Sequence, residues 1–302
     1  MQSERVGDEL MIEVKNLTQI YKSGKGIFGV TFEVREGEVF GYLGPNGAGK
    51  TTTIRNLMGF MNATEGEAII DGKNCRKDSA ELKGIIGYLP GEMNMMDQMT
   101  GMEFLKFMAE MRGLKNLTKM KQLIEKFELD ATGKIKKMSK GMKQKIGLIV
   151  AFMHDPKVLI LDEPTSGLDP LMQQVFMDLI LEEKKAGKTI IMSSHIFEEI
   201  QRLCDRVAVI KDGKIVTVED VNDLENLNSK TFIITANSGI EKLITFNGTA
   251  KKIIDDKVKL TVNYPYNEFY KLLSEIDVAN MRIEQVSIEN TFMKYYGNAG
   301  EQ

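Results

Sequence analysis

A short glycine-rich stretch constrains what this chain can fold into more than any other part of its sequence. It consists of Gly44, Pro45, Asn46, Gly47, Ala48, Gly49, Lys50 and Thr51. These residues fit the pattern GxxxxGK[ST] and follow the apolar run Val39–Leu43, which predicts a buried strand. Glycines let backbone N–H groups approach an anion closely, and the helix that follows directs its positive end at the same point. The stretch therefore predicts a phosphate-binding loop between a strand and a helix.

The residues at the end of this loop indicate the kind of phosphate. We expect Lys50 to place its positive charge on β- and γ-phosphates, the Thr51 hydroxyl to bind Mg²⁺, and Thr52 to reach an α-phosphate. The alternative is an ordinary glycine-rich turn without a ligand. The buried strand before the loop and the expected helix after it argue against that alternative.

A second apolar run, Val158–Leu161, ends in two carboxylates, Asp162 and Glu163. In a parallel sheet the carboxyl ends of the strands form the edge at which ligands bind. We expect Asp162 to hold Mg²⁺ through water and Glu163 to act as general base on the attacking water. A strand followed by an acidic turn of no function is the competing interpretation, which the phosphate loop disfavours.

Length and composition bound the organisation of the chain. Its 302 residues, 42% of them hydrophobic and 27% charged, suit one large domain and a smaller one. The net charge of −3 gives no general attraction to nucleic acid, and the two cysteines predict no disulfide framework. The longest apolar run, Ile146–Met153, is too short for a bilayer span of about 20 residues.

The order of the expected elements predicts an α/β fold. Residues 10–75 carry short alternating strands, 93–153 a helical lobe, and further buried strands follow. We place the first domain at residues 1–225 and a small C-terminal α+β domain at residues 226–302. The expected elements of that domain are strands at Thr231–Ala236, Lys257–Val262 and Arg282–Val286, a helix around Asn267–Ile276 and a helix capped by Ser287.

Three further motifs follow the phosphate loop in a characteristic order. They are Ser139-Lys140-Gly141-Met142, the run from Asp162 to Asp169, and Ser193-Ser194-His195. Together with the loop they resemble the ATPases of the ATP-binding cassette (ABC) family over about residues 10–220. The resemblance implies a P-loop ABC ATPase core with an antiparallel β lobe and a helical lobe, and ATP and Mg²⁺ as cofactors.

The resemblance also implies roles for single residues. It implies a head-to-tail dimer in which Ser139 and Gly141 contact the ATP held by the partner subunit, and in which Asp169 couples the two sites. His195 stands at the position of the switch histidine, which contacts the γ-phosphate. Tyr21 resembles the aromatic residue that stacks on adenine, although a structural strand tyrosine is the competing interpretation.

The sequence departs from the family at two places. After the expected strand at 85–90, Gly91 and Glu92 stand where the family has a glutamine that ligates Mg²⁺ and senses the membrane partner. Either Glu92 substitutes for it, or coupling at this loop differs. The signature is Met138-Ser139-Lys140-Gly141-Met142 in place of L-S-G-G-Q. Both variants resemble a bacterial export-type branch with a separate permease.

We therefore expect an ATPase subunit of an ABC transporter, working as an exporter at the inner face of the cell membrane. The expected partners are a polytopic membrane permease and a second cassette, identical or different, with no nucleic acid. One alternative is a soluble ABC-type ATPase acting on ribosomes or nucleic acid. Another is a regulatory ATP-binding module that does not hydrolyse, which the presence of Lys50, Asp162, Glu163 and His195 disfavours.

Overall fold

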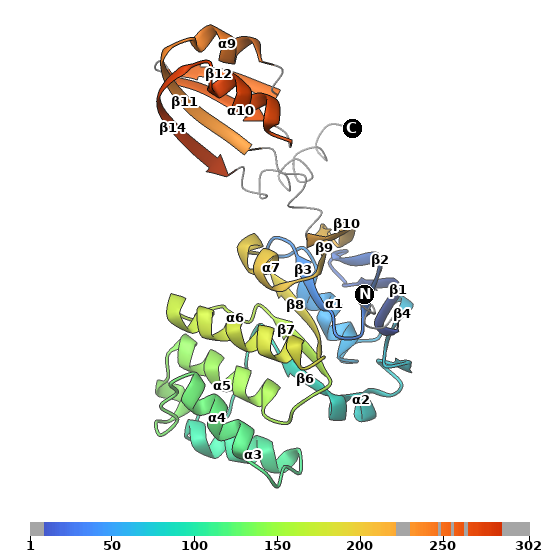
Figure 1. Ribbon diagram of the computed structural model, residues 1–302. Coiled ribbons are helices and arrows are strands. Elements are labelled where there is room, and N and C mark those ends of the chain that lie inside the picture. Colours follow the sequence, from blue (N-terminus) through green and yellow to red (C-terminus); the bar gives the residue numbers. More distant parts are fainter. Residues whose placement is uncertain (1–8, 222–229, 247–248, 255–256, 263–264, 286–302) are drawn as a thin grey trace, which may run out of the picture. The chain divides into compact units, whose positions relative to one another are not determined.

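A computed structural model describes residues 9–221, 230–246, 249–254, 257–262 and 265–285 of the chain (Figure 1). The chain divides into two compact units, Met1–Glu219 and Asp220–Gln302. This division lies a few residues before the expected boundary at 225/226, because strand β10 ends there and completes the last hairpin of the first unit. The expected Ser287-capped helix lies outside the described residues.

The sheet that carries the site is mostly parallel. Within the described residues its order is β10-β9-β3-β8-β7-β6, and the five strands from β9 to β6 in this order run parallel to one another. The bounds are β3 Val39–Leu43, β6 Ile86–Leu89, β7 Val158–Asp162, β8 Thr189–Ser194, β9 Arg206–Lys211 and β10 Lys214–Asp220. Every residue of β3, β7 and β8 is buried, as expected for the central strands of a sheet covered on both faces.

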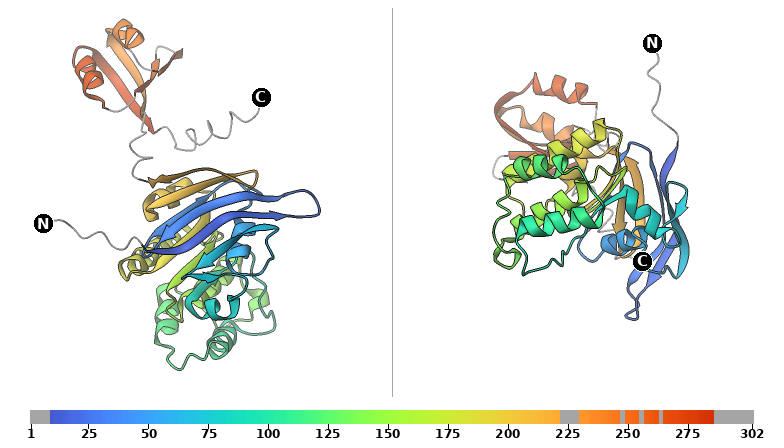
Figure 2. Two further views of the ribbon diagram at one scale, coloured as in Figure 1. Left: turned by 90° about the vertical axis from the view of Figure 1, so that its right-hand side faces the viewer. Right: turned by 90° about the horizontal axis from the view of Figure 1, so that it is seen from below.

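An antiparallel sheet forms the second layer of the first unit. Its order is β2-β1-β4-β5, with β1 Leu10–Ile20, β2 Gly26–Arg35, β4 Glu65–Ile70 and β5 Lys73–Asn74. Strands β1 and β2 form a long hairpin, drawn in blue in Figure 2. Along β2 buried and exposed residues alternate, and the buried ones share one core with β3 and helix α1. The predicted β lobe is therefore confirmed.

Helices connect the strands of the first unit. They are α1 Lys50–Leu57, α2 Ser79–Ile85, α3 Gly101–Met111, α4 Thr118–Lys126, the 3₁₀ turn Ile135–Lys137, α5 Lys140–Phe152, α6 Pro170–Lys185 and α7 Phe197–Leu203. Helices α3, α4 and α5 lie together, away from the antiparallel sheet (Figures 1 and 2). Thr100 and Glu103 form a capping box that begins α3. These helices form the predicted helical lobe, although residues 93–99 are not helical.

The second unit is a small α+β domain. It contains β11 Lys230–Ser238, α9 Ile240–Thr245, β12 Thr249–Ile254, β13 Lys257–Val262, α10 Asn267–Leu273 and β14 Asp277–Gln285. The strand order β12-β13-β11-β14, with antiparallel neighbours, is that of a split βαβ arrangement. Its core includes Phe232, Leu260 and Phe269.

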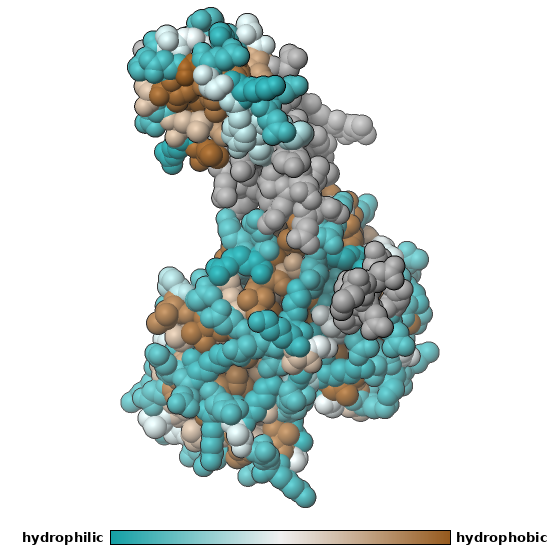
Figure 3. All heavy atoms as spheres, in the orientation of Figure 1, coloured by the Kyte–Doolittle hydropathy of each residue, from teal (hydrophilic) through white to brown (hydrophobic). Residues whose placement is uncertain are grey.

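Across the described residues no helix is both long and apolar enough to cross a membrane. On the face of the first unit shown in Figure 3, hydrophilic side chains predominate and apolar side chains form scattered patches.

Candidate functional site

Three neighbouring strands end at one edge of the parallel sheet. The last residue of β3 pairs with Ser194 of β8, and Asp162 of β7 pairs with Ser193 of β8. The residues that follow these strand ends are the phosphate loop, His195 and Glu163. Because parallel strands present their carboxyl ends at the same edge, groups far apart in the sequence meet there.

The phosphate loop has the backbone that its glycines permit. Gly47 and Gly49 have φ of 82° and 113°, in the left-handed region that favours glycine. A Cβ on Gly49 would lie 2.6 Å from Cγ2 of Ile27. Helix α1 begins at Lys50, immediately after the loop. The loop therefore leads directly into a helix N-terminus, which is the arrangement that binds phosphate.

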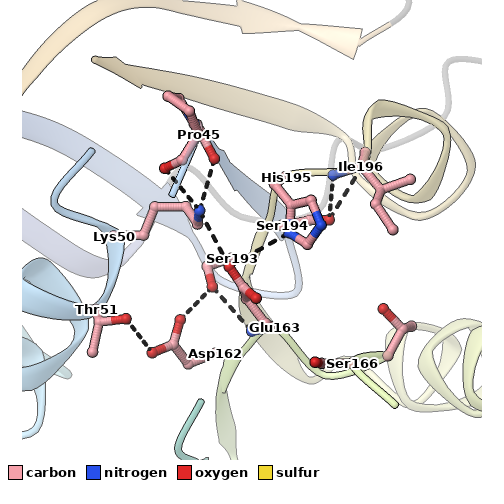
Figure 4. Close-up of polar contacts among 12 residues, drawn as sticks. Pro45, Lys50, Thr51, Asp162, Glu163, Ser166, Ser193, Ser194, His195 and Ile196 are labelled. Atoms are coloured by element: carbon pink, nitrogen blue, oxygen red, sulfur yellow. Dashed lines mark hydrogen bonds and ion pairs between the residues drawn. The ribbon is translucent and has the colours of Figure 1, made fainter. Parts of the chain in front are cut away.

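Lys50 is held within the loop by hydrogen bonds. Its side chain is 5% exposed, and its Nζ donates to the carbonyl oxygens of Gly44 at 2.7 Å and Pro45 at 3.2 Å. The same Nζ lies 3.3 Å from Oε1 of Glu163 (Figure 4). These contacts fix the Lys50 ammonium group within the loop, at the point where the loop would bind an anion.

Asp162 and Glu163 are joined through one serine. The Ser193 hydroxyl donates to Oδ1 of Asp162 at 2.5 Å and accepts a hydrogen bond from the backbone N–H of Glu163 at 3.0 Å. The other carboxylate oxygen of Asp162 accepts from the Thr51 hydroxyl at 2.8 Å (Figure 4). Glu163 has φ of 49°, which is uncommon for a residue with a side chain and marks a constrained site.

His195 faces the same carboxylate. Its Nδ1 lies 3.5 Å from Oε1 of Glu163, and its side chain is 47% exposed. Lys50 and His195 thus approach one oxygen of Glu163 from the phosphate loop and from the turn after β8 (Figure 4). The sequence placed all three residues at one site, and the structure brings them together.

A cavity of about 360 Å³ adjoins the phosphate loop. The loop lines it together with Tyr21, Thr52 and Glu163. The Tyr21 hydroxyl lies 3.2 Å from Oγ1 of Thr52, and the Tyr21 side chain is partly exposed. The cavity volume falls in the range of small-molecule sites, and Tyr21 lies on its wall as the adenine-stacking hypothesis requires.

A second cavity, of about 690 Å³, adjoins both acids. Gly91, Glu92, Lys140, Asp162 and Glu163 are among its lining residues. A Cβ on Gly91 would lie 3.1 Å from Oδ2 of Asp162. Where the family has a glutamine side chain, this chain therefore places the backbone of Gly91 beside the Asp162 carboxylate.

The signature residues begin helix α5. Ser139 is its N-cap, and the Ser139 hydroxyl accepts from the backbone N–H of Met142 at 3.2 Å. A Cβ on Gly141 would lie 2.6 Å from the carbonyl oxygen of Gly167, so only glycine fits this approach. Asp169 caps α6 in the same way, accepting from Met172 N–H at 3.0 Å.

Sequence reasoning missed the buried polar residues that support this site. The sequence indicated Ser193 only as part of the motif Ser193-Ser194-His195, and it indicated no role for Gln144 or Glu199. The Gln144 amide donates to the carbonyl oxygen of Pro164 at 2.8 Å. Glu199 is 8% exposed and accepts from two hydroxyls, those of Thr165 and Ser194. No local pattern in the sequence distinguishes Glu199 from Glu198, its exposed neighbour.

A groove rich in methionine lies between α3, α5 and β6. Its volume is about 690 Å³, and Met93, Met95, Met108, Met111 and His154 are among the residues that line it. His154 Nε2 lies 3.1 Å from the carbonyl oxygen of Ile86. Burial, and then the positive charge of Arg112, lower the pKa of His154 to about 4. The imidazole is therefore neutral at physiological pH, and the groove is largely apolar.

Comparison with known proteins identifies similar sequences and folds. Residues 27–166 match the family model described as ABC transporter. An uncharacterized ABC transporter ATP-binding protein of Methanocaldococcus jannaschii is 37% identical over 269 residues, covering 86% of this chain and 97% of that protein. A linearmycin resistance ATP-binding protein of Bacillus subtilis is 30% identical and covers 95% of this chain and 98% of its own length.

Solved structures resemble the first unit. The structure of an ATP-binding subunit of an ABC transporter has a TM-score of 0.65 at 30% identity, over 71% of this chain and 92% of that one. A dimeric ATP-binding cassette in a post-hydrolysis state, bound to ADP and Pi, has a TM-score of 0.64 at 25% identity, over 70% and 99% of the two chains.

Proposed function

Because this chain belongs to the ABC transporter family as an ATP-binding, ATP-hydrolysing subunit, we propose that it drives a separate membrane permease and that it works as an exporter. The observation that carries the hydrolytic part of this function is the convergence of Lys50, Glu163 and His195 on one point beside the phosphate loop. Such a cluster suits transfer of a phosphoryl group to water, in which positioning and charge stabilisation supply most of the catalysis.

In this proposal each residue of the cluster has one task. The loop N–H groups and Lys50 bind the β- and γ-phosphates, and the entering phosphate draws Lys50 away from Glu163. Glu163 accepts a proton from the attacking water, and His195 donates a hydrogen bond to the γ-phosphate. The ion pair between Lys50 and Glu163, at 3.3 Å, then belongs to the protein without nucleotide.

The residues beside Lys50 suit a magnesium ion. The Thr51 hydroxyl and the Asp162 carboxylate lie 2.8 Å apart, and both supply the hard oxygen ligands that Mg²⁺ prefers. Mg²⁺ sites of this kind use one or two protein oxygens and complete their shell with phosphate oxygens and water. When bound, the ion would neutralise charge on the phosphates. Thr51 and Asp162 would hold it, and their present hydrogen bond keeps the two oxygens on the same side.

A second cassette completes the site in this proposal. Ser139 stands at the N-terminus of the 13-residue helix α5, and its hydroxyl and the helix end suit an anion brought by a partner subunit. The dimeric ADP-and-Pi cassette structure, 25% identical to this chain, supports such an assembly. The absence of a side chain on Gly141 lets the start of α5 approach the carbonyl oxygen of Gly167, and Asp169 caps α6 two residues later.

The permease contact is assigned to the methionine-rich groove. Methionine side chains adapt to the shape of a partner, and Met111 is 71% exposed at the groove. A helical segment of the permease on the cytoplasmic side would bring this chain to the inner face of the membrane. The relative named for linearmycin resistance supports export, since removal of a compound is one route to resistance.

The test is purification of the chain from its native membranes in mild detergent, with identification of co-purified proteins by mass spectrometry. We expect a stoichiometric polytopic membrane protein. Met111→Glu should reduce its recovery, whereas Leu181→Glu, an exposed position on α6 outside the groove, should not. Recovery of ribosomes or nucleic-acid-binding proteins instead would favour the soluble ABC-type ATPase and contradict the transport role.

A further inference from the structure

Glu199 occupies a buried position between two parts of the site. It belongs to α7, lies four residues after His195 in the sequence and is 8% exposed. Its Oε1 accepts a hydrogen bond from the Thr165 hydroxyl at 2.5 Å, and its Oε2 accepts one from the Ser194 hydroxyl at 2.6 Å. One carboxylate therefore accepts a hydrogen bond from each of the two hydroxyls.

The Ser194 side of this network fixes the backbone around His195. The Ser194 hydroxyl accepts from the N–H of Ile196 at 2.9 Å, so the residues before and after the histidine are tied to the same oxygen. The Ser194 carbonyl accepts from Gly44 N–H at 3.2 Å, which joins this turn to the start of the phosphate loop. By contrast, the imidazole of His195 is 47% exposed. Among the ion pairs of the described residues it takes part in one, between its Nδ1 and Oε1 of Glu163 at 3.5 Å.

The Thr165 side reaches the loop that begins at Glu163. Thr165 is 5% exposed, and its carbonyl oxygen accepts from Leu168 N–H at 3.0 Å. The carbonyl oxygen of Glu163 accepts from Ser166 N–H at 3.1 Å, which closes the turn in which Thr165 lies. One carboxylate therefore holds the turn that carries His195 against the turn that carries Glu163.

We infer that Glu199 is a positioning residue for ATP hydrolysis, which holds the His195 turn and the Glu163–Leu168 turn in fixed relation. This inference rests on the roles proposed above for His195 and Glu163. Glu199 touches neither the nucleotide cavity nor the reacting atoms, since the residues that line that cavity do not include it. Its effect on turnover passes through the placement of His195.

The first experiment is a double-mutant cycle of steady-state ATP hydrolysis, with Glu199→Gln, His195→Ala and the double variant. The Glu199→Gln change keeps the size of the side chain but removes the charge and one acceptor. We expect Glu199→Gln to lower kcat on the order of tenfold with KM for ATP within about twofold, because misplaced catalytic groups affect the transition state. In the His195→Ala background the same change should cost little more.

A second readout follows the imidazoles directly. The sequence has two histidines, so selective isotope labelling gives two imidazole signals in NMR spectra, from His154 and His195. Glu199→Gln should shift or broaden the His195 signal and leave the His154 signal in place. Glu198→Gln, the same change at the exposed neighbouring residue of α7, is the matched control and should move neither signal. Thr165→Val, which removes the opposite hydroxyl, should act like Glu199→Gln if the latter fails to fold.

The outcomes separate this inference from the proposed function. An unchanged His195 signal, or an equal loss of kcat from Glu199→Gln with and without His195, would overturn the positioning role. If His195→Ala leaves turnover intact, the proposed role of His195 is wrong, and the NMR signals still decide whether Glu199 positions the ring.

Discussion

Removing the Ser193 hydroxyl should damage both the stability of the first unit and its catalysis. Ser193 is 0% exposed, and it alone links the Asp162 carboxylate to the backbone N–H of Glu163 among the hydrogen bonds of the described residues. Ser193→Ala removes the hydroxyl, deprives Asp162 of a donor and leaves the Glu163 N–H without its acceptor.

The magnitude follows from these two contacts. A hydrogen bond to a charged group contributes about 1.5–3 kcal/mol, and an unpaired buried N–H costs about 1–3 kcal/mol. Because both contacts use one oxygen and the neighbours can relax, we expect a total loss of about 2–4 kcal/mol. At about 2–4 °C per kcal/mol for a domain of this size, Tm should fall by roughly 4–16 °C.

The assay is calorimetric unfolding together with ATP hydrolysis at saturating ATP. Glu163 would lose its backbone anchor, so we expect kcat to fall at least on the order of tenfold. Ser79→Ala is the control, since it removes a hydroxyl at the start of α2 without touching either acid. A Ser193→Ala protein with unchanged Tm and kcat within about twofold of the wild type would refute this reasoning.

Three further predictions test other parts of the site. Tyr21→Phe should keep ATP affinity while Tyr21→Ala lowers it about tenfold, if the ring stacks on adenine; titration with a fluorescent ATP analogue measures this, and equal affinity of the two variants would count against stacking. Glu92→Ala should lower permease-stimulated hydrolysis if Glu92 replaces the missing glutamine, and unimpaired stimulation would show that it does not. The folded pKa of His154, about 4, lies below its ordinary 6.5, so the stability that neutral His154 contributes is present above pH 6.5 and is lost as pH falls to about 4. As the pH falls over that interval, the unfolding free energy of the wild type should therefore decrease relative to that of His154→Gln. A constant difference between the two would be inconsistent with the lowered pKa.

Much of the fold was predictable because its signals are local. The runs Val39–Leu43 and Val158–Leu161 are apolar throughout, and each leads into residues with a recognisable chemistry. Serine is a preferred N-cap, so Ser139 marks the start of α5 by its residue type alone. Such features depend on neighbours in the sequence, which the sequence itself displays.

The features that escaped prediction depend on weak or distant signals. Helix α2 buries only Leu82 strongly, and α9 spans six residues, so neither has a clear periodicity. The place of Ser193 between two acids follows from the pairing of β7 with β8, which no local pattern encodes. The partners of Glu199 likewise come from a turn more than thirty residues earlier in the chain and from the preceding strand end.

ATP-dependent dimerisation and the role of Glu163 are tested together by the molar mass of Glu163→Gln, measured by light scattering at low salt with and without ATP and Mg²⁺. We expect a monomer without nucleotide and a dimer with ATP, because a bound but uncleaved γ-phosphate should bridge the phosphate loop of one subunit and Ser139 of the other. Glu163→Gln should also abolish hydrolysis. A protein that stays monomeric with ATP would contradict the ATP-bridged dimer, and hydrolysis at the wild-type rate would contradict the role of Glu163 as general base.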